Sequence, residues 1–480
     1  MDFPEYEDLF CLLLFEEDRG LIKHMSKSKQ KRHVAAGKGS SAPAPDGHRR
    51  KLLIAGLSGL GTLAIAGGVG YRAGWFGGKK EAGPVLSGSP GRMTKALPPV
   101  RLPADEANAI QAATDIVSHY TRELRNASSG IHAVRAIGRN FTLDDGSKAV
   151  DFLCSEFAAE REVNGRRYVY FPREHEVHDN SFLKTFLEAG VGPDQPIKAG
   201  GNRYTLRDLG ESAKALFRFD PADVRRYDPV LPEEHLPWGL IAFSILIPPT
   251  QPTWTNAYGE KIDLNQVIDR GLADYESVCR QLITADTPPT GESVEYRQKI
   301  TKYSCYGMHS FYGFFSCYRH GYRENNLPGR LQEMVDHIIT RLQRDSEALA
   351  QEMEAARNYG QKFIAQMGVG PDGNRRGQGN PPPQIIEVMG LNNFIKMNGH
   401  AFEALNYVRL HKLFPISPVQ LKRMQVAEKQ LHQTMVMLRS YDLDAFYQWD
   451  PKFVSDIVIA VSHALRGMKL LGPNNPDTVA

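Results

Sequence analysis

Apolar residues recur three and four positions apart through most of the chain after residue 105. This spacing places apolar side chains along one face of a helix and therefore predicts amphipathic α-helices. The predicted helical segments are residues 106–124, 181–190, 205–219, 233–246, 263–283, 293–319, 331–360, 385–413, 417–440 and 452–471. Thr205 to Asp208 also has the form of a capping box at the start of one of them. The pattern predicts an all-α fold.

Residues 157–171 interrupt the helical pattern. Here Asn164-Gly165 separates two short runs rich in valine and aromatic residues. An Asn-Gly pair between two such runs is the strongest short signal for a β-hairpin, because both residues tolerate positive φ. We therefore expect one small β-hairpin within the helical fold.

The N-terminal part of the chain has a different character. Residues 52–71 form an uncharged stretch long enough to span a bilayer as a helix, and the residues before it are basic. By the positive-inside rule, the basic part stays cytoplasmic and the remainder crosses the membrane. The expected organisation is a disordered basic tail (1–51), a transmembrane helix or export signal (52–76), a flexible Gly/Pro/Ser-rich linker (77–103) and a helical domain (104–480), with a possible internal boundary near 368–383.

Arg49-Arg50-Lys51-Leu52-Leu53, followed by this Gly-rich apolar run, resembles a twin-arginine export signal. The resemblance implies a location in the bacterial inner membrane, with the C-terminal domain in the periplasm or outside the cell. No small-x-small cleavage site follows Tyr71, so both a cleaved signal and a retained anchor stay open. Residues 1–24 are acidic, and Met25 is an alternative start to Met1.

Composition narrows the possible partners. The chain has a net charge of only +3, with 41% hydrophobic and 24% charged residues, as is typical of a globular domain with a core. No basic stripe interleaved with aromatic residues is present, which argues against nucleic acid as the main partner. The five cysteines are few and widely spaced, so they do not form a disulfide scaffold.

The stretch from residue 303 to 322 contains the densest group of chemically versatile side chains. At 100° per residue, one helix would place Cys305, His309, Tyr312, Ser316 and His320 along one stripe, opposite an aromatic face. No Lys, Glu or Asp lies between the first and last of these residues, although a solvated helix face normally carries them. The stripe is therefore expected to line a cavity, or alternatively to face solvent or a neighbouring helix.

The same stretch recurs later in the chain. His309-Ser-Phe311, with His320 eleven residues after the first histidine, is echoed 91 residues later by His400-Ala-Phe402 and His411. A Pro-containing turn and another long helix follow each copy. Repeated helix hairpins are typical of a solenoid or of a closed α/α toroid.

Residues 237–262 (PWGLIAFSILIPPTQPTWTNAYGEKI) and 305–322 (CYGMHSFYGFFSCYRHGY) resemble segments of exported bacterial proteins with terpene-cyclase or prenyltransferase-like α/α-toroid repeats. The resemblance covers approximately residues 130–345. It implies a fold and no particular reaction, because one toroid supports many chemistries. The acidic DxDD motif of squalene-type cyclases is absent from the sequence.

Two residues of this stretch could bind a metal ion. Cys305 and His309 lie four positions apart, about 6 Å along a helix, so a zinc ion could bridge them. One or two further ligands would have to come from His175, His178 or His235. The alternative is that the thiol and the imidazole are packing residues only.

Other candidates lie outside this stretch. Glu176 and His178, just before a helix start, could act as a general base with the carboxylate that orients it, or could form an ordinary capping loop. His235 lies at the start of an apolar helix. Trp254 and Tyr258 belong to an aromatic loop that could stack a sugar ring or a prenyl chain. No phosphate-binding loop, nucleophile elbow or HExxH motif is present.

These observations leave two functions open. The domain could bind an extended small-molecule, polysaccharide or protein ligand in the cell envelope, with Tyr312, His320, Trp254, Tyr258 and His400 as contacts. It could instead be an envelope enzyme that uses His309, His178, His235 and Glu176 for acid/base or metal-assisted chemistry. The two are distinguished by whether Cys305, His309 and any of His175, His178 or His235 meet around a pocket. Scatter of these residues over the exterior would end the enzyme hypothesis.

Overall fold

The computed structural model describes residues 93, 96–98, 100, 103–176, 178–227, 232–283, 304–367, 380–473 and 475–477. The predicted transmembrane segment, its flanking tail and most of the linker lie outside this part of the chain, as does most of the possible boundary at 368–383. None of the helices within the described ranges combines the length and the apolar character that crossing a bilayer requires.

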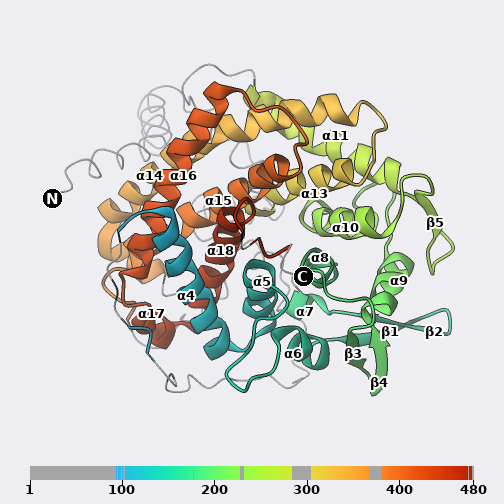
Figure 1. Cartoon of the computed structure of the whole chain (residues 1–480), viewed down its shortest axis with the longest axis horizontal. Helices are drawn as coiled ribbons and strands as arrows, with labels where there is room; N and C mark the ends of the chain where they lie inside the picture. The colour runs from blue at the N-terminus through green and yellow to red at the C-terminus, as the bar shows by residue number, and fades with distance from the viewer. Residues whose placement is uncertain are drawn as a thin grey trace, which may run out of the picture.

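The described chain is predominantly helical, which confirms the predicted all-α class (Figure 1). The helices are α4 (Glu106–Leu124), α5 (Ala127–Ile137), α6 (Ala149–Glu156), α7 (Arg173–Glu176), α8 (Ser181–Glu188), α9 (Leu206–Leu216), α10 (Pro232–Leu246), α11 (Leu264–Ile283), η3 (Ser304–Gly307), α13 (Met308–Arg319), α14 (Leu327–Met367), α15 (Ile385–Leu410), α16 (Pro418–Arg439), α17 (Leu443–Trp449) and α18 (Pro451–Lys469). The strands are β1 (Ala159–Val163), β2 (Arg166–Tyr170), β3 (Pro196–Ala199), β4 (Asn202–Thr205), β5 (Thr253–Thr255) and β6 (Lys261–Asp263).

The expected hairpin is present as β1 and β2, joined by Asn164 and Gly165 with φ of 51° and 76°. The expectation of a single hairpin is wrong, because β3–β4 and β5–β6 form two more within the described residues. Gly200 and Gly201, both with positive φ, make the β3–β4 turn. Strands of three or four residues are too short to show a recognisable alternation of apolar and polar positions.

Six helices lie around the centre of the molecule. In the order α5, α8, α10, α13, α15 and α18, each contacts the next, and α18 contacts α5 again (Figure 1). Neighbouring helices in this series run parallel to each other in the cases where contacts between their side chains show the direction. His309 and Tyr312 of α13 meet His400 and Tyr407 of α15, in the same order along both helices. We call these six the inner helices.

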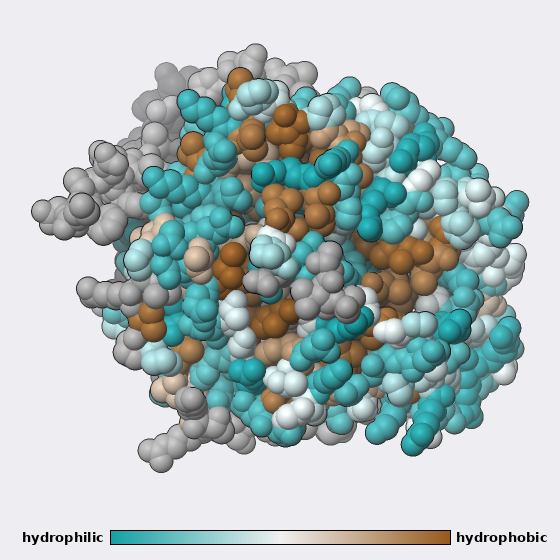
Figure 2. All heavy atoms as spheres, in the orientation of Figure 1, coloured by the Kyte–Doolittle hydropathy of each residue, from teal (hydrophilic) through white to brown (hydrophobic). Residues whose placement is uncertain are grey.

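The remaining long helices lie outside the inner ones (Figure 1). Helix α4 packs on α5 and α18, α14 on α13 and α15, α11 on α10 and α13, and α9 on α8 and α10. Figure 2 shows one face of the molecule, where polar side chains cover the periphery and apolar ones gather toward the middle.

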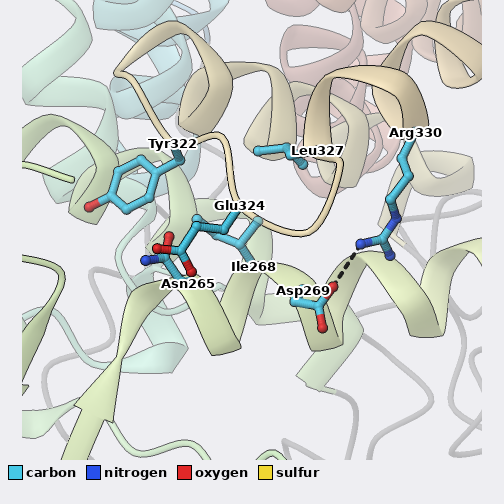
Figure 3. Close-up of a pocket in the computed structure, with 7 residues that line it drawn as sticks. All are labelled: Asn265, Ile268, Asp269, Tyr322, Glu324, Leu327 and Arg330. Atoms are coloured by element: carbon cyan, nitrogen blue, oxygen red, sulfur yellow. Dashed lines mark hydrogen bonds and ion pairs between the residues drawn. The ribbon is translucent and has the colours of Figure 1, made fainter.

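A small crevice separates α11 from the start of α14, with Tyr322, Leu327 and Arg330 on its α14 side (Figure 3). Arg330 closes one end through a 2.7 Å ion pair with Asp269. The crevice has a volume of about 10 Å³, which leaves room for about one water molecule. It is therefore a packing defect and not a ligand site.

The prediction of one continuous helix over 293–319 is wrong within the described residues. The chain makes a 3₁₀ turn at η3 and restarts as α13, with positive φ at both Cys305 and Gly307. A Cβ on Gly307 would lie 2.5 Å from Cε2 of Tyr275, so this corner requires glycine. Helix α13 is then buried on both faces, with His309 against α15 and Phe311 against Tyr275.

Candidate functional site

The inner helices carry a buried network of charged and polar side chains, which we call the central ionic cluster. Its members come from α5, α8, α13, α15, α18 and the chain's C-terminal segment: Arg135, Lys184, Glu188, Tyr312, Glu403, His463, Arg466 and Asp477. Most of these side chains are 8% exposed or less, and Asp477 is 20% exposed. Such groups are stable in a protein interior only when they are paired and hydrogen-bonded.

Glu403 is the hub of this cluster. Its Oε1 accepts hydrogen bonds from Arg135 Nε at 2.6 Å and Arg466 Nη1 at 2.7 Å, and its Oε2 lies 2.8 Å from His463 Nδ1. Burial alone would raise the pKa of this carboxyl group, but Arg135, His463 and Arg466 together hold it well below the ordinary value. Glu403 is therefore ionised and joins three helices.

Glu188 forms the second anionic centre. Lys184 Nζ lies 2.9 Å from its Oε2, and the hydroxyl of Tyr312 donates to its Oε1. Arg466 Nη2 donates to the Tyr312 hydroxyl at 2.9 Å and to Asp477 at 2.7 Å. The cluster thus balances three cations (Arg135, Lys184, Arg466) against three carboxylates (Glu188, Glu403, Asp477).

A thiol and two imidazoles meet beside this cluster. One ligand atom each from Cys305, His309 and His400 lie within 4.8 Å of one another, and we call these residues the Cys/His cluster. Two of them are the pair expected to hold a metal, and the third was expected to contact a ligand. The other suggested ligands, His175, His178 and His235, do not belong to this group.

A row of neighbouring rings connects the Cys/His cluster to the periphery. His235 lies 5.6 Å from His178 between ring centroids, and His178 stacks on Trp238 at 3.9 Å. Trp238 in turn lies 4.4 Å from His309. On the far side, His400 stacks on His463 at 3.6 Å, and His463 binds Glu403 of the central ionic cluster.

Three imidazoles of this row, His309, His400 and His463, are neutral. Burial lowers the pKa of His309 and of His463 well below the usual value, and the pKa of His400 to about 3. A neutral imidazole offers a lone pair on one nitrogen, which is the form that accepts a proton or binds a metal ion.

The outer end of the row opens on a pocket with a volume of about 590 Å³, within the range of small-molecule sites. It lies at the N-terminal ends of α8 and α10. Glu176, His235 and Tyr258, three of the residues expected from the sequence, line it. Further polar residues of its wall are Arg161, Arg173, Glu174, Asp179 and Tyr227, and apolar ones include Phe171, Leu183 and Phe217.

The pKa values of two carboxyl groups of this pocket, Glu176 and Asp179, are shifted in opposite directions. Glu176 is 7% exposed and accepts a hydrogen bond from the amide of Phe182 at 2.9 Å, and burial raises its pKa well above the ordinary value. Burial acts in the same direction on Asp179, but the bidentate ion pair with Arg173 at 2.7 and 2.8 Å lowers its pKa overall. The pocket thus combines two carboxyl groups whose pKa values are shifted in opposite directions, an arrangement that acid/base enzymes use.

The remaining predicted residues lie elsewhere. Tyr312 belongs to the central ionic cluster, and His320 lies at the end of α13, 3.2 Å from Arg319. Trp254 donates its indole N–H to the carbonyl of Lys214 at 2.8 Å and is not part of the pocket wall. The predicted site residues are therefore divided among the Cys/His cluster, the pocket, the central ionic cluster and positions outside all three.

Sequence reasoning missed most of the central ionic cluster. A signal was available, because single charged residues interrupt apolar stretches at Lys184 (SFLKTFLE), Glu403 (HAFEAL) and Arg466 (SHALRGM). A charge on the buried face of a helix needs a partner from another helix.

No family model, curated protein or solved structure matches this chain.

Proposed function

We propose that the helical domain is an α/α toroid, as the repeat pattern suggested. Support comes from the circuit of contacts through the six inner helices, from their parallel direction where contacts fix it, and from the outer position of α4, α9, α11 and α14. In such a fold the site would lie at one end of the inner helices. Both the pocket and His309 lie near the N-terminal ends of α8, α10 and α13.

We infer that the protein is an enzyme that performs acid/base chemistry in this pocket. The observation that carries the inference is the meeting of Glu176, Asp179 and His235 in one pocket of ligand size. Glu176 would act as the general acid and the ionised Asp179 as the carboxylate that stabilises positive charge. His235 would receive or return a proton at the pocket's inner wall.

Of an extended small molecule, a polysaccharide and a protein segment, the polysaccharide fits this pocket best. Sugar rings have apolar faces that stack on aromatic side chains and hydroxyl groups that bind charged ones. The wall supplies Tyr227 and Tyr258 as aromatic surfaces, with Arg218 lying over both rings at 3.8 and 4.3 Å. Glycosidic bonds are also cleaved by pairs of carboxyl groups of unlike protonation. A cell-envelope polysaccharide is therefore the proposed substrate class.

Replacing Glu176 with glutamine tests this function. The variant keeps the shape and the acceptor for the Phe182 amide but cannot donate a proton. We expect the full chain to release reducing ends from isolated envelope polysaccharide, and the variant to do so at least about 100-fold more slowly. The measurement is a reducing-end assay with circular dichroism as the folding check.

Glu162→Gln is the matched control, because Glu162 is an exposed glutamate of β1 that does not line the pocket. Its activity should stay near that of the wild type. Equal losses in both variants would contradict the assigned role of Glu176. Saturable binding of the polysaccharide without turnover by the wild type would instead identify a non-catalytic binding module, the alternative that the arginine and tyrosine wall favours. Absence of both turnover and binding would reject the saccharide proposal.

We also propose that residues 52–71 place this domain on the outer side of a bacterial inner membrane. The support is the uncharged stretch with its basic N-terminal flank. Protease added to intact spheroplasts should then cleave an epitope tag at the C-terminus. Protection of the tag until the membrane is lysed would contradict the proposed orientation.

A further inference from the structure

The Cys/His cluster has the composition of a transition-metal site. A cysteine sulfur with two imidazole nitrogens is a ligand set that suits zinc, and three protein ligands with one remaining position describe a zinc site that can take a water or a substrate. The ligand atoms of Cys305, His309 and His400 already lie within 4.8 Å of one another. Tetrahedral zinc with ordinary bond lengths separates its ligand atoms by about 3.3 to 3.6 Å, so small side-chain rotations suffice.

His400 shows how one ligand is prepared for this role. Its Nδ1 bonds the carbonyl oxygen of Lys396, one turn earlier on α15, which assigns the proton to Nδ1. Its Nε2 is buried and has no hydrogen-bond partner among the residues that the structure describes. Metal-binding histidines typically donate one ring N–H to a carbonyl and coordinate with the other nitrogen. A metal ion bound to Nε2 would satisfy this buried nitrogen.

Cys305 is positioned by an unusual backbone. The chain holds this residue at φ of 51° in the 3₁₀ turn before α13, a conformation that a non-glycine residue seldom adopts. The turn brings its sulfur alongside His309 of the first turn of α13 and His400 of α15. Such strain persists where the surrounding structure enforces it, often at functional sites.

Access also suits a bound cation. His309 and His400 are buried, whereas Cys305 retains partial exposure, so an ion could enter on the cysteine side.

We propose that Cys305, His309 and His400 bind one zinc ion. This proposal goes beyond the pocket chemistry and does not depend on it, because metal content is measured without a substrate. The inner end of the ring row would then hold a metal, separated from the pocket by Trp238 and His178.

Metal analysis of the purified full chain tests the site. We expect about one zinc ion per chain in the wild type. The variants Cys305→Ser and His400→Gln should lose stoichiometric zinc. Cys317→Ser is the matched control, because it removes a buried thiol of α13 that lies against the Leu240 carbonyl, and it should keep its zinc.

A second measurement does not depend on how the variants fold. After chelator treatment, the wild-type chain is titrated with Co²⁺, which reports thiolate ligation through a charge-transfer band in the near ultraviolet and tetrahedral geometry through visible bands. We expect both bands, and reversal on addition of Zn²⁺. A wild type without zinc that also shows no charge-transfer band would overturn the proposal, as would a folded Cys305→Ser variant that retains the band.

Discussion

Replacing Glu403 with glutamine is expected to lower the free energy of unfolding by about 3 to 5 kcal/mol. The carboxylate is 2% exposed and lies 2.6 to 2.8 Å from Arg135, His463 and Arg466. Glutamine has nearly the same shape, so packing is preserved while two buried guanidinium groups lose their main counter-ion. The cost of such unpaired buried charges exceeds that of losing an ordinary hydrogen bond.

Urea unfolding of the full chain, followed by circular dichroism, measures this loss. The control is Asp194→Asn, because Asp194 and Arg207 form a 3.2 Å ion pair whose side chains are 84% and 65% exposed. That variant should change stability by less than about 1 kcal/mol. A loss below about 1 kcal/mol in Glu403→Gln would show that the central ionic cluster does not hold the inner helices together.

The pH dependence gives an independent check on the same residue. The pKa of Glu403 in the folded protein is well below its ordinary value, so its stabilising effect is present above the ordinary carboxyl pKa. It is lost progressively as the pH falls below that value toward the folded pKa, because the unfolded chain then binds a proton that the folded chain does not. The difference in stability between the wild type and Glu403→Gln should therefore shrink in acid.

Replacing Gly399 with alanine is expected to cost about 1 to 3 kcal/mol, or more if the helices cannot separate. A Cβ at this position would lie 2.8 Å from the backbone nitrogen of Ala464 on α18. The obstacle is main chain and cannot rotate away, so α15 and α18 would have to move apart. A larger separation would also weaken the contacts of Glu403 with His463 and Arg466.

The control for this substitution is Gly192→Ala. No atom of the described residues lies within 4 Å of a Cβ added at Gly192, so the unfolding free energy of this variant should remain close to that of the wild type. Both variants are compared by urea unfolding. Equal stabilities of Gly399→Ala and the wild type would indicate that the two helices do not need their close approach.

Helices were predictable from sequence because their periodicity is local. The capping box at Thr205 and Asp208 forms as expected, and the β1–β2 hairpin follows from Asn164-Gly165. The break before α13 was not predictable, because the residues around Gly307 have helical spacing. The turn depends on a close contact between Gly307 and Tyr275, which comes from another helix.

The candidate site was only partly predictable for a similar reason. The four-residue spacing of Cys305 and His309 is visible in the sequence, and the repeat drew attention to His400. The meeting of all three depends on the packing of α13 beside α15. Partners such as Arg135 and Glu403, separated by 268 positions, leave no local pattern that would pair them.

By itself, the sequence determined the helical class, the position of most helices, one hairpin and the residue types available for chemistry. These features depend on interactions within a few residues, and periodicity, caps and turn residues encode them directly. Only the tertiary structure decided that Glu176 and His235 share a pocket, that Cys305 meets His400, and that Glu403 anchors a balanced set of buried charges. Those contacts depend on which helices become neighbours, and burial of many apolar side chains at once selects that arrangement.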